Sequence, residues 1–173
     1  YLALGNIAAY KGLSELVDAF KQVAGMSDVL LVAGRNRDQN SVSHLVKTAQ
    51  SDDRIYVHPR FIPDKEMQVY LLAADVMVAP FKQVLTSSSV ITGMSFDLPQ
   101  IVPALGCLPE LVTPEAGIVS DPQNADGLRR ALVDIKTRDA DQMRGAVRRI
   151  TDGLGWAAIG RQTADIYRSC LAS

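Results

Sequence analysis

Short apolar runs alternate along this chain with segments whose apolar residues recur every three or four positions. The runs lack polar alternation, as do strands that are buried on both faces of a sheet. They predict five strands and a short sixth strand at an edge, over residues 1–4, 29–33, 55–57, 76–79, 100–102 and 118–119. The helical spacing predicts amphipathic helices between and after them, over residues 13–23, 41–50, 63–73, 90–96, 109–112, 123–137, 139–150 and 156–171.

This alternation predicts a single α/β domain over residues 1–173. Its architecture is a doubly wound, Rossmann-like parallel sheet with helices on both faces and a helical C-terminal tail. In such sheets ligands bind beyond the carboxyl ends of the strands. Functional residues are therefore expected in the loops that follow the strands, over residues 5–12, 34–40, 58–64, 80–89 and 103–110.

Composition narrows the classes of function. Hydrophobic residues make up 47% of the chain and charged residues 21%, as in packed soluble domains. The net charge of −1 argues against a general nucleic-acid binder. The chain has no apolar run of the roughly 20 residues that a membrane helix needs, and its two cysteines favour a reducing compartment. It does not begin with Met, so we expect it to be part of a longer protein.

The first loop, from Gly5 to Gly12, carries a lysine where the first helix begins. It matches neither the dinucleotide-binding glycine motif nor the P-loop motif. A helix start attracts anions, and the charge of Lys11 adds to that attraction. The loop is therefore either a phosphate site or a helix start with a solvated lysine.

Four consecutive hydroxyl residues, Thr86–Ser89, precede the predicted helix over residues 90–96. One of them suffices to cap the helix. The others, with free backbone amides and the nearby Lys82, are suited to hold a phosphate. The cluster thus reads equally well as a cap and as an anion site.

Other polar residues in the predicted ligand loops give weaker indications. Glu110 is expected in the first turn of a short helix, where a carboxylate stabilises the helix dipole. Cys107 is expected to be a buried small hydrophobe. His44 and His58 have no partners at the spacing of metal ligands, so no metal site is expected. A basic stretch on the late helices, from Arg129 to Arg149, is expected to be a salt-bridged solvent face, with contact to anionic lipid or to a partner as the alternative.

In their order along the chain these features resemble the C-terminal, donor-binding half of GT-B fold glycosyltransferases of the retaining family-4, or group 1, type. The resemblance covers nearly the whole chain. The first strand with its lysine-glycine loop and helix matches over residues 1–20, the second strand with its glycine over 30–34, and the third loop over 58–64. The strand that ends in proline matches over residues 72–80, and the stretch with the glycine–proline–glutamate turn over 94–112. The small edge strand matches over residues 116–122 and the terminal helix over 155–167.

The resemblance implies a nucleotide-diphosphate sugar at the carboxyl edge of the sheet. Lys11 falls on the family's pyrophosphate lysine and is the expected catalytic residue. The other expected phosphate-binding residues are Gly5, Asn6, Ser87, Ser88 and Ser89. The expected nucleoside-binding residues are Arg60, Phe61, Ile62 and Thr92. No cofactor or metal is expected, because helix starts and basic side chains neutralise the departing diphosphate in this family.

The chain departs from the family pattern at three positions. The family's arginine after the first-loop glycine is Asn6 here, and the family's two glutamates, eight positions apart, are Val84 and Thr92. The second glutamate commonly holds the ribose hydroxyls, for which Thr92 is a weaker substitute. Loss of a charge-assisted partner costs about 1.5–3 kcal/mol of binding.

The resemblance predicts a hexosyltransferase-like enzyme that moves a sugar from the donor to a saccharide or lipid-linked acceptor with retention of configuration. The acceptor half is absent from this chain, so the isolated domain is expected to be inactive. The family's common setting is polysaccharide synthesis in the cytoplasm, with peripheral contact at the inner face of the cell membrane as an open alternative. Two other functions remain open: a degenerate, non-catalytic scaffold or partner, and a nucleotide-sugar epimerase.

Overall fold

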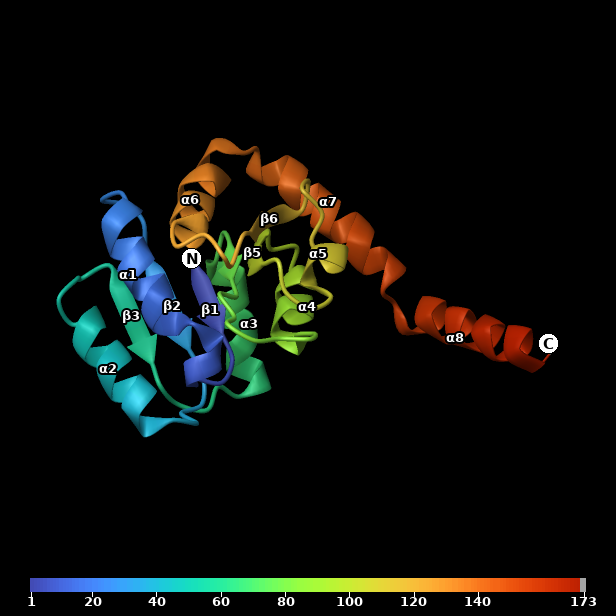
Figure 1. Ribbon diagram of the computed structural model, residues 1–173, viewed down its shortest axis with the longest axis horizontal. Coiled ribbons are helices and arrows are strands. Elements are labelled where there is room, and N and C mark those ends of the chain that lie inside the picture. Colours follow the sequence, from blue (N-terminus) through green and yellow to red (C-terminus); the bar gives the residue numbers. More distant parts are fainter. Residues whose placement is uncertain (172–173) are drawn as a thin grey trace.

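The computed structural model describes residues 1–171, in which six strands form one sheet with the order β3-β2-β1-β4-β5-β6 (Figure 1). All pairings are parallel. The strands are β1 (Leu2–Leu4), β2 (Leu30–Ala33), β3 (Ile55–His58), β4 (Met77–Val78), β5 (Gln100–Pro103) and β6 (Gly117–Ser120). This strand order is that of the doubly wound Rossmann fold, so the predicted fold class is confirmed.

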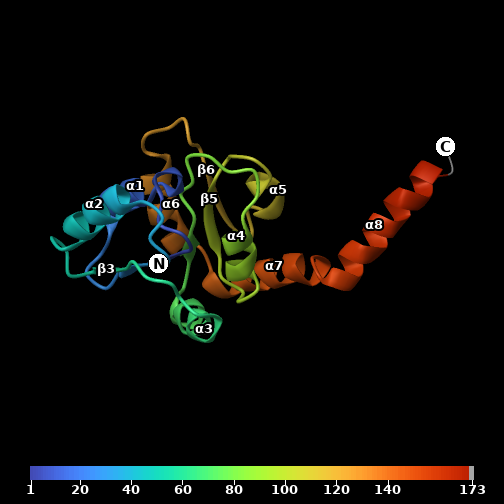
Figure 2. The ribbon, with the colours of Figure 1, turned by 90° about the horizontal axis from the view of Figure 1, so that it is seen from below.

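Within this part of the chain helices cover both faces of the sheet, and the last helix extends away from it (Figure 1). The helices are α1 (Leu13–Val23), α2 (Gln39–Ala49), α3 (Asp64–Ala73), α4 (Ser88–Met94), α5 (Leu108–Leu111), α6 (Gly127–Asp134), α7 (Ala140–Gly153) and α8 (Trp156–Leu171), with short 3-10 helices η1 (Ala9–Lys11) and η2 (Ile135–Thr137). Figure 2 shows α3 on the opposite side of the sheet from α1 and α2.

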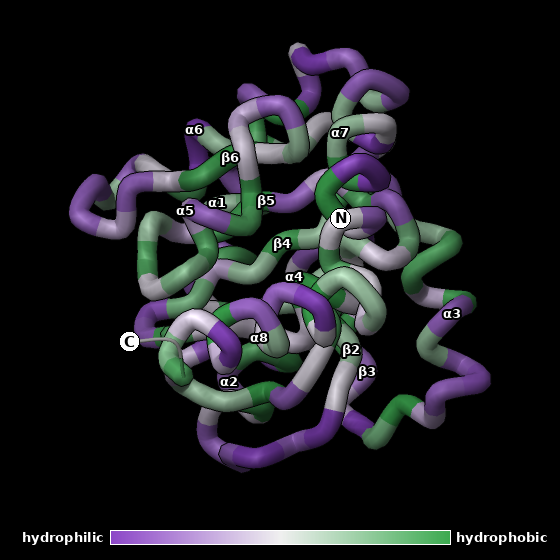
Figure 3. Tube along the Cα trace, turned by 90° about the vertical axis from the view of Figure 1, so that its right-hand side faces the viewer, coloured by the Kyte–Doolittle hydropathy of each residue, from purple (hydrophilic) through white to green (hydrophobic). Residues whose placement is uncertain are grey.

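Successive side chains of a strand point to opposite faces, and β1 shows how this builds two cores. Ala3 packs in one hydrophobic cluster with Leu16 and Phe20 of α1. Its neighbour Leu2 packs in another with Leu71 of α3. The inner strands β1 and β2 are therefore apolar throughout, because both of their faces are covered. The edge strand β3 instead exposes Tyr56 and His58. In Figure 3 green, hydrophobic segments lie along the inner strands, whereas purple, hydrophilic segments lie mainly on the outer turns.

The loops after β1 and β2 touch directly through Gly34. A side chain at this position would place its Cβ 1.6 Å from the Gly5 carbonyl oxygen, and the φ of Gly34 is +152°. Only glycine adopts such a backbone without strain and leaves room for the neighbouring chain. The contact holds the two ligand-side loops together.

The predicted elements are all present, with shifted boundaries at some ends. The helix predicted over residues 123–137 begins only at Gly127. Its expected first turn is instead a loop, because Asp121 accepts from the Gln123 amide at 2.8 Å and Asn124 accepts from the Asp126 amide at 2.9 Å. Such local side-chain bonds compete with helical bonds.

The C-terminal tail leaves the body of the domain (Figure 1). Helix α7 still packs into the core through Met143, Ala146 and Val147. Helix α8, over Trp156–Leu171, has no buried residue. Trp156 at its start is 91% exposed.

The basic stretch is salt-bridged only in part. Arg129 pairs with Asp126 of the same stretch at 2.5 Å. Arg144 and Arg148 instead pair with Asp75 and Asp97 from earlier loops. These arginines therefore tie the late helices to the rest of the domain, which sequence spacing did not indicate.

Replacement of Leu16 tests the core described above. Leu16 is fully buried, so we expect Leu16→Ala to lower the free energy of unfolding by about 2–5 kcal/mol. Leu72→Ala is the matched control, since Leu72 is 74% exposed, and it should change the value by less than about 0.5 kcal/mol. Urea unfolding followed by circular dichroism measures both. Equal effects would contradict this account of the core.

Candidate functional site

The loop after β1 places the Lys11 ammonium near two aromatic rings, those of Tyr10 and Phe81. Gly12 adopts a left-handed conformation, and a Cβ on it would lie 2.0 Å from the carbonyl oxygen of Pro80. The Lys82 amide also donates to the Tyr10 carbonyl at 2.8 Å. The first loop is thus fixed against the loop after β4, and Lys11 Nζ lies 4.2 Å from the centroid of the Phe81 ring.

Three of the predicted phosphate-binding residues converge. A Cβ built on Gly5 would lie 3.9 Å from Lys11 Nζ and 3.8 Å from Ser89 Oγ. A cation, a hydroxyl and a glycine without a side chain therefore surround one small space at the carboxyl ends of the strands. This combination suits a phosphate, which needs donors and close access to the backbone.

The charge of Lys11 has no carboxylate partner. Among residues 1–171 no ion pair of 4 Å or less involves it. Burial lowers the pKa of the Lys11 ammonium below its ordinary value of 10.5, because desolvation disfavours the charged form. A bound anion would relieve this cost.

One serine of the cluster caps a helix, as expected, and another lies beside Gly5. Ser87 caps α4, accepting a hydrogen bond from the Val90 amide at 3.4 Å. Its Oγ also lies 3.0 Å from Ser89 Oγ. Ser88 is exposed. Capping thus occupies Ser87, whereas Ser89 is directed to the space beside Gly5 and Lys11.

Lys82 does not serve the serine cluster as the sequence suggested. Its ammonium forms an ion pair with Glu15 of α1. Proximity in sequence did not predict this ion pair. The Lys82 amide donates to the Tyr10 carbonyl, and this bond turns the residue toward the first loop.

Two of the predicted nucleoside-binding residues share a cavity with the first loop. Phe61 and Ile62 line a space of about 260 Å³ together with Gly5 and Asn6. Ile62 is buried, while the Phe61 ring is 58% exposed. This cavity adjoins the space around Lys11 through the Gly5–Asn6 turn.

The other two predicted nucleoside-binding residues have their polar groups engaged. The Arg60 guanidinium pairs with Glu66 at 2.5 Å, and it does not line the cavity. The Thr92 hydroxyl donates to the Ser88 carbonyl at 2.9 Å. A hydroxyl bound to its own helix leaves only lone pairs for a ligand.

Val84 packs against a hydrophobic core cluster. The loop that carries it is held by Gly106, where a Cβ would lie 2.6 Å from the Val84 carbonyl oxygen, and by the bond of 2.8 Å from the Cys107 amide to the Leu85 carbonyl. Cys107 itself is exposed, so the expectation of a buried thiol was wrong. Its backbone faces the neighbouring loop, and that leaves its side chain outside.

Two basic residues of the cavity were missed by the sequence interpretation. Arg35 and Arg37, in the loop after β2, line the same space of about 260 Å³ as Asn6. Their signal in the sequence was the basic character of loop 34–40, one of the expected ligand loops.

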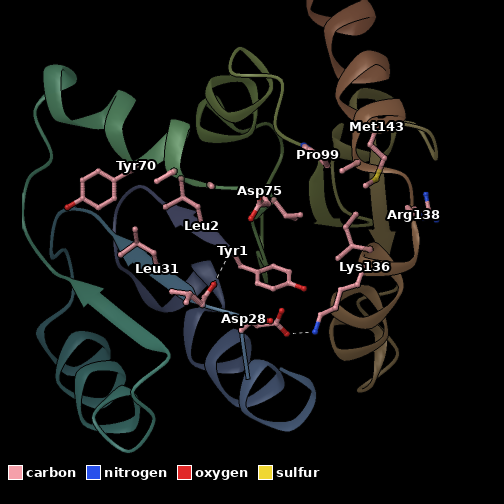
Figure 4. Close-up of a pocket in the computed structure, with 17 residues that line it drawn as sticks. Tyr1, Leu2, Asp28, Leu31, Tyr70, Asp75, Pro99, Lys136, Arg138 and Met143 are labelled. Carbon is pink, nitrogen blue, oxygen red and sulfur yellow. Dashed lines mark hydrogen bonds and ion pairs between the residues drawn. The ribbon is translucent and has the colours of Figure 1, made fainter. Parts of the chain in front are cut away.

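A separate cavity of about 540 Å³ lies at the amino ends of the strands, opposite the carboxyl ends that carry the candidate site (Figure 4). Its lining includes residues that immediately precede strands, among them Tyr1, Val29, Val76 and Pro99. Asp28 and Lys136, which also line it, form an ion pair. Because ligands of doubly wound sheets bind at the carboxyl ends, this cavity is not the candidate site.

Over residues 1–171 no group of three His, Cys, Asp or Glu side chains could hold a metal ion. In the same part of the chain, no helix has the length and apolar character that crossing a membrane requires.

Comparison with known proteins identifies the family. The sequence pattern of "Glycosyl transferases group 1" matches residues 1–137, and this chain therefore belongs to the group 1 glycosyltransferases. A comparison with curated proteins finds no significant match.

Solved structures share the fold. Sucrose-phosphate synthase from Thermosynechococcus elongatus matches 99% of this chain over 45% of its own, with 28% identity and a TM-score of 0.79. Anabaena HepE in complex with UDP matches 98% over 49%, with 17% identity and the same TM-score. The C-terminal domain of LpcC, a group 1 glycosyl transferase from Francisella tularensis, matches 87% over 81%, with 18% identity and a TM-score of 0.73.

This chain thus spans about half the length of the sucrose-phosphate synthase and HepE chains. It spans 81% of the LpcC structure, which is itself a C-terminal domain.

The lowered pKa of Lys11 gives a test of the site. In the free domain the Lys11 ammonium should titrate below 10.5, and a bound nucleoside diphosphate should raise that pKa, because an opposite charge favours the protonated form. At a pH above the lowered pKa of Lys11, binding of the nucleoside diphosphate should therefore be accompanied by proton uptake. NMR of lysines labelled at Cε measures the titration, and Lys11→Arg assigns the resonance. A Lys11 pKa that does not rise on binding would contradict direct contact with the diphosphate.

Proposed function

We propose that this domain binds a nucleotide-diphosphate sugar at the carboxyl edge of its sheet. The observation that carries the proposal is the convergence of Lys11 Nζ and Ser89 Oγ on Gly5, within 4 Å of one point. The diphosphate lies there, and the nucleoside lies in the adjoining cavity against Phe61 and Ile62. Lys11, unpaired and partly desolvated, stabilises the negative charge that develops on the departing diphosphate.

Related structures support this ligand class. HepE was solved in complex with UDP, and also with UDP and glucose. The name of sucrose-phosphate synthase likewise describes a sugar-transferring enzyme. These proteins have the same half-domain fold as this chain, which favours a sugar nucleotide over other phosphate ligands.

The longer protein is proposed to transfer a hexose from the donor to a saccharide or lipid-linked acceptor, with retention of configuration. Its other half supplies the acceptor site. The reaction needs no metal in this proposal, because Lys11 and backbone amides at the start of α4 neutralise the diphosphate. We place it in polysaccharide synthesis, in the cytoplasm or at the inner face of the cell membrane.

A second candidate function is a non-catalytic module that acts as a scaffold or partner. Two observations favour it: Val84 packs against a hydrophobic core cluster, and the Thr92 hydroxyl is bound within its helix. Neither position offers the carboxylate that the family pattern has there. A nucleotide-sugar epimerase is a third candidate, and product analysis with donor alone separates it from a transferase.

Calorimetric titration with UDP, GDP and ADP in the presence of EDTA tests the proposal. We expect micromolar binding of one nucleotide that Lys11→Ala weakens about tenfold or more, since it removes a charge-assisted contact. Lys47→Ala is the matched control, because Lys47 is an exposed lysine in the last turn of α2. It should leave the affinity unchanged.

The outcomes separate the candidates. Binding that survives EDTA and depends on Lys11 supports a metal-independent donor site. Absence of binding by all three nucleotides in a folded domain favours the non-catalytic module. Equal effects of the two lysine substitutions would contradict the assignment of the site.

The isolated domain is expected to be inactive as a transferase. The described residues form the donor half alone, and a transferase must hold both reactants in line to react. An assay of glucose transfer from UDP-glucose to water or to added saccharides, monitored through the release of UDP, measures this activity. Turnover by the isolated domain would overturn the expectation.

A further inference from the structure

The loop after β2 is bonded to the loop after β1 beyond the ends of both strands. The Gly5 amide donates to the Ala33 carbonyl at 3.0 Å, and the Ile7 amide donates to the Arg35 carbonyl at 2.9 Å. The Arg37 amide returns a bond of 3.0 Å to the Ile7 carbonyl. With the close approach of Gly34 to Gly5, these bonds fix the backbone of Arg35 beside Asn6.

The side chains of this second loop face the proposed donor site. Arg35 and Arg37 line the same cavity of about 260 Å³ as Asn6 and Phe61. This cavity shares Gly5 and Asn6 with the small space beside Lys11. A ligand that extends from Lys11 across the Gly5–Asn6 turn therefore passes the two arginines.

These arginines are available to an anion. Within residues 1–171 neither guanidinium has a carboxylate within 4 Å. Other cations near this edge are already paired, Arg60 with Glu66 and Lys82 with Glu15. The unpaired positive charge of the ligand-side loops is thus concentrated on Lys11, Arg35 and Arg37.

The Phe61 ring holds Arg35 in place without using its donors. The guanidinium carbon lies 5.0 Å from the centroid of the ring. A stacked guanidinium keeps its five N–H groups free, because they lie in its own plane. The planar fork is suited to two oxygens of one phosphate group.

We propose that Arg35, assisted by Arg37, is a binding residue for the diphosphate of the donor, and that it supplies the cation that Asn6 lacks. This proposal rests on the proposed function. The positive charge is displaced from the first loop to the second, and the close contact between the two loops keeps it at the same cavity.

The test is a titration of wild type, Arg35→Gln and Arg35→Lys with the nucleoside diphosphate that wild type binds best, at several NaCl concentrations. We expect Arg35→Gln to weaken binding about tenfold or more and to make it less sensitive to salt, since one phosphate-neutralising charge is lost. Arg35→Lys should retain the salt dependence and bind more tightly than Arg35→Gln but less tightly than wild type, because lysine keeps the charge without the planar fork. Arg130→Gln is the matched control, because Arg130 is exposed on α6.

Each outcome decides the proposal. Unchanged affinity in Arg35→Gln overturns it, and so does weaker binding with unchanged salt dependence, because the contact is then to the nucleoside. If Arg35→Gln abolishes binding, retention by Arg35→Lys supports the charge and loss in both overturns it. An equal effect of Arg130→Gln also overturns it.

If wild type binds no nucleotide, the proposed function fails and this proposal fails with it. If wild type binds but the Arg35 variants contradict the expected effects, only the role of Arg35 fails and the proposed donor site is retained.

Discussion

The arrangement of the site depends on the contact between Gly34 and the carbonyl of Gly5. Parallel strands normally separate where their ladder ends, but here the ladder continues through Ile7 into both loops. Glycine makes this possible, because any side chain at position 34 would overlap the neighbouring backbone. The contact thereby joins the two halves of the proposed donor pocket, the diphosphate end at Gly5 and the nucleoside end at Phe61.

Charge is distributed unevenly in a molecule whose net charge is only −1. Two carboxylates near the ligand edge are neutralised by other residues, Glu15 by Lys82 and Glu66 by Arg60. Lys11 is desolvated without a counter-ion, which costs folding free energy. Sites that keep such uncompensated charge are typically functional, since an anionic ligand can recover the cost on binding.

The sequence predicted the order of elements and the edge at which the site forms, because buried strands and amphipathic helices leave distinct patterns. It predicted Lys11 and Ser89 individually, but their convergence on Gly5 depends on the contact of the first loop with Pro80. Contacts between distant loops also explain what was missed. The pairing of Lys82 with Glu15 and the exposure of Cys107 follow from how loops pack, and local spacing carries no record of that. The late start of α6 has a local cause, two side-chain bonds that compete with the helix.

Helix α8 has a thermodynamic consequence of its own. A helix of 16 residues that buries nothing lies near the length at which isolated helices are only marginally stable in water. Its helical order is therefore coupled to any surface that covers its apolar side chains, and the free energy of docking includes the free energy of forming the helix. Contact and helix formation at this end of the chain are a single equilibrium, separate from the stability of the sheet.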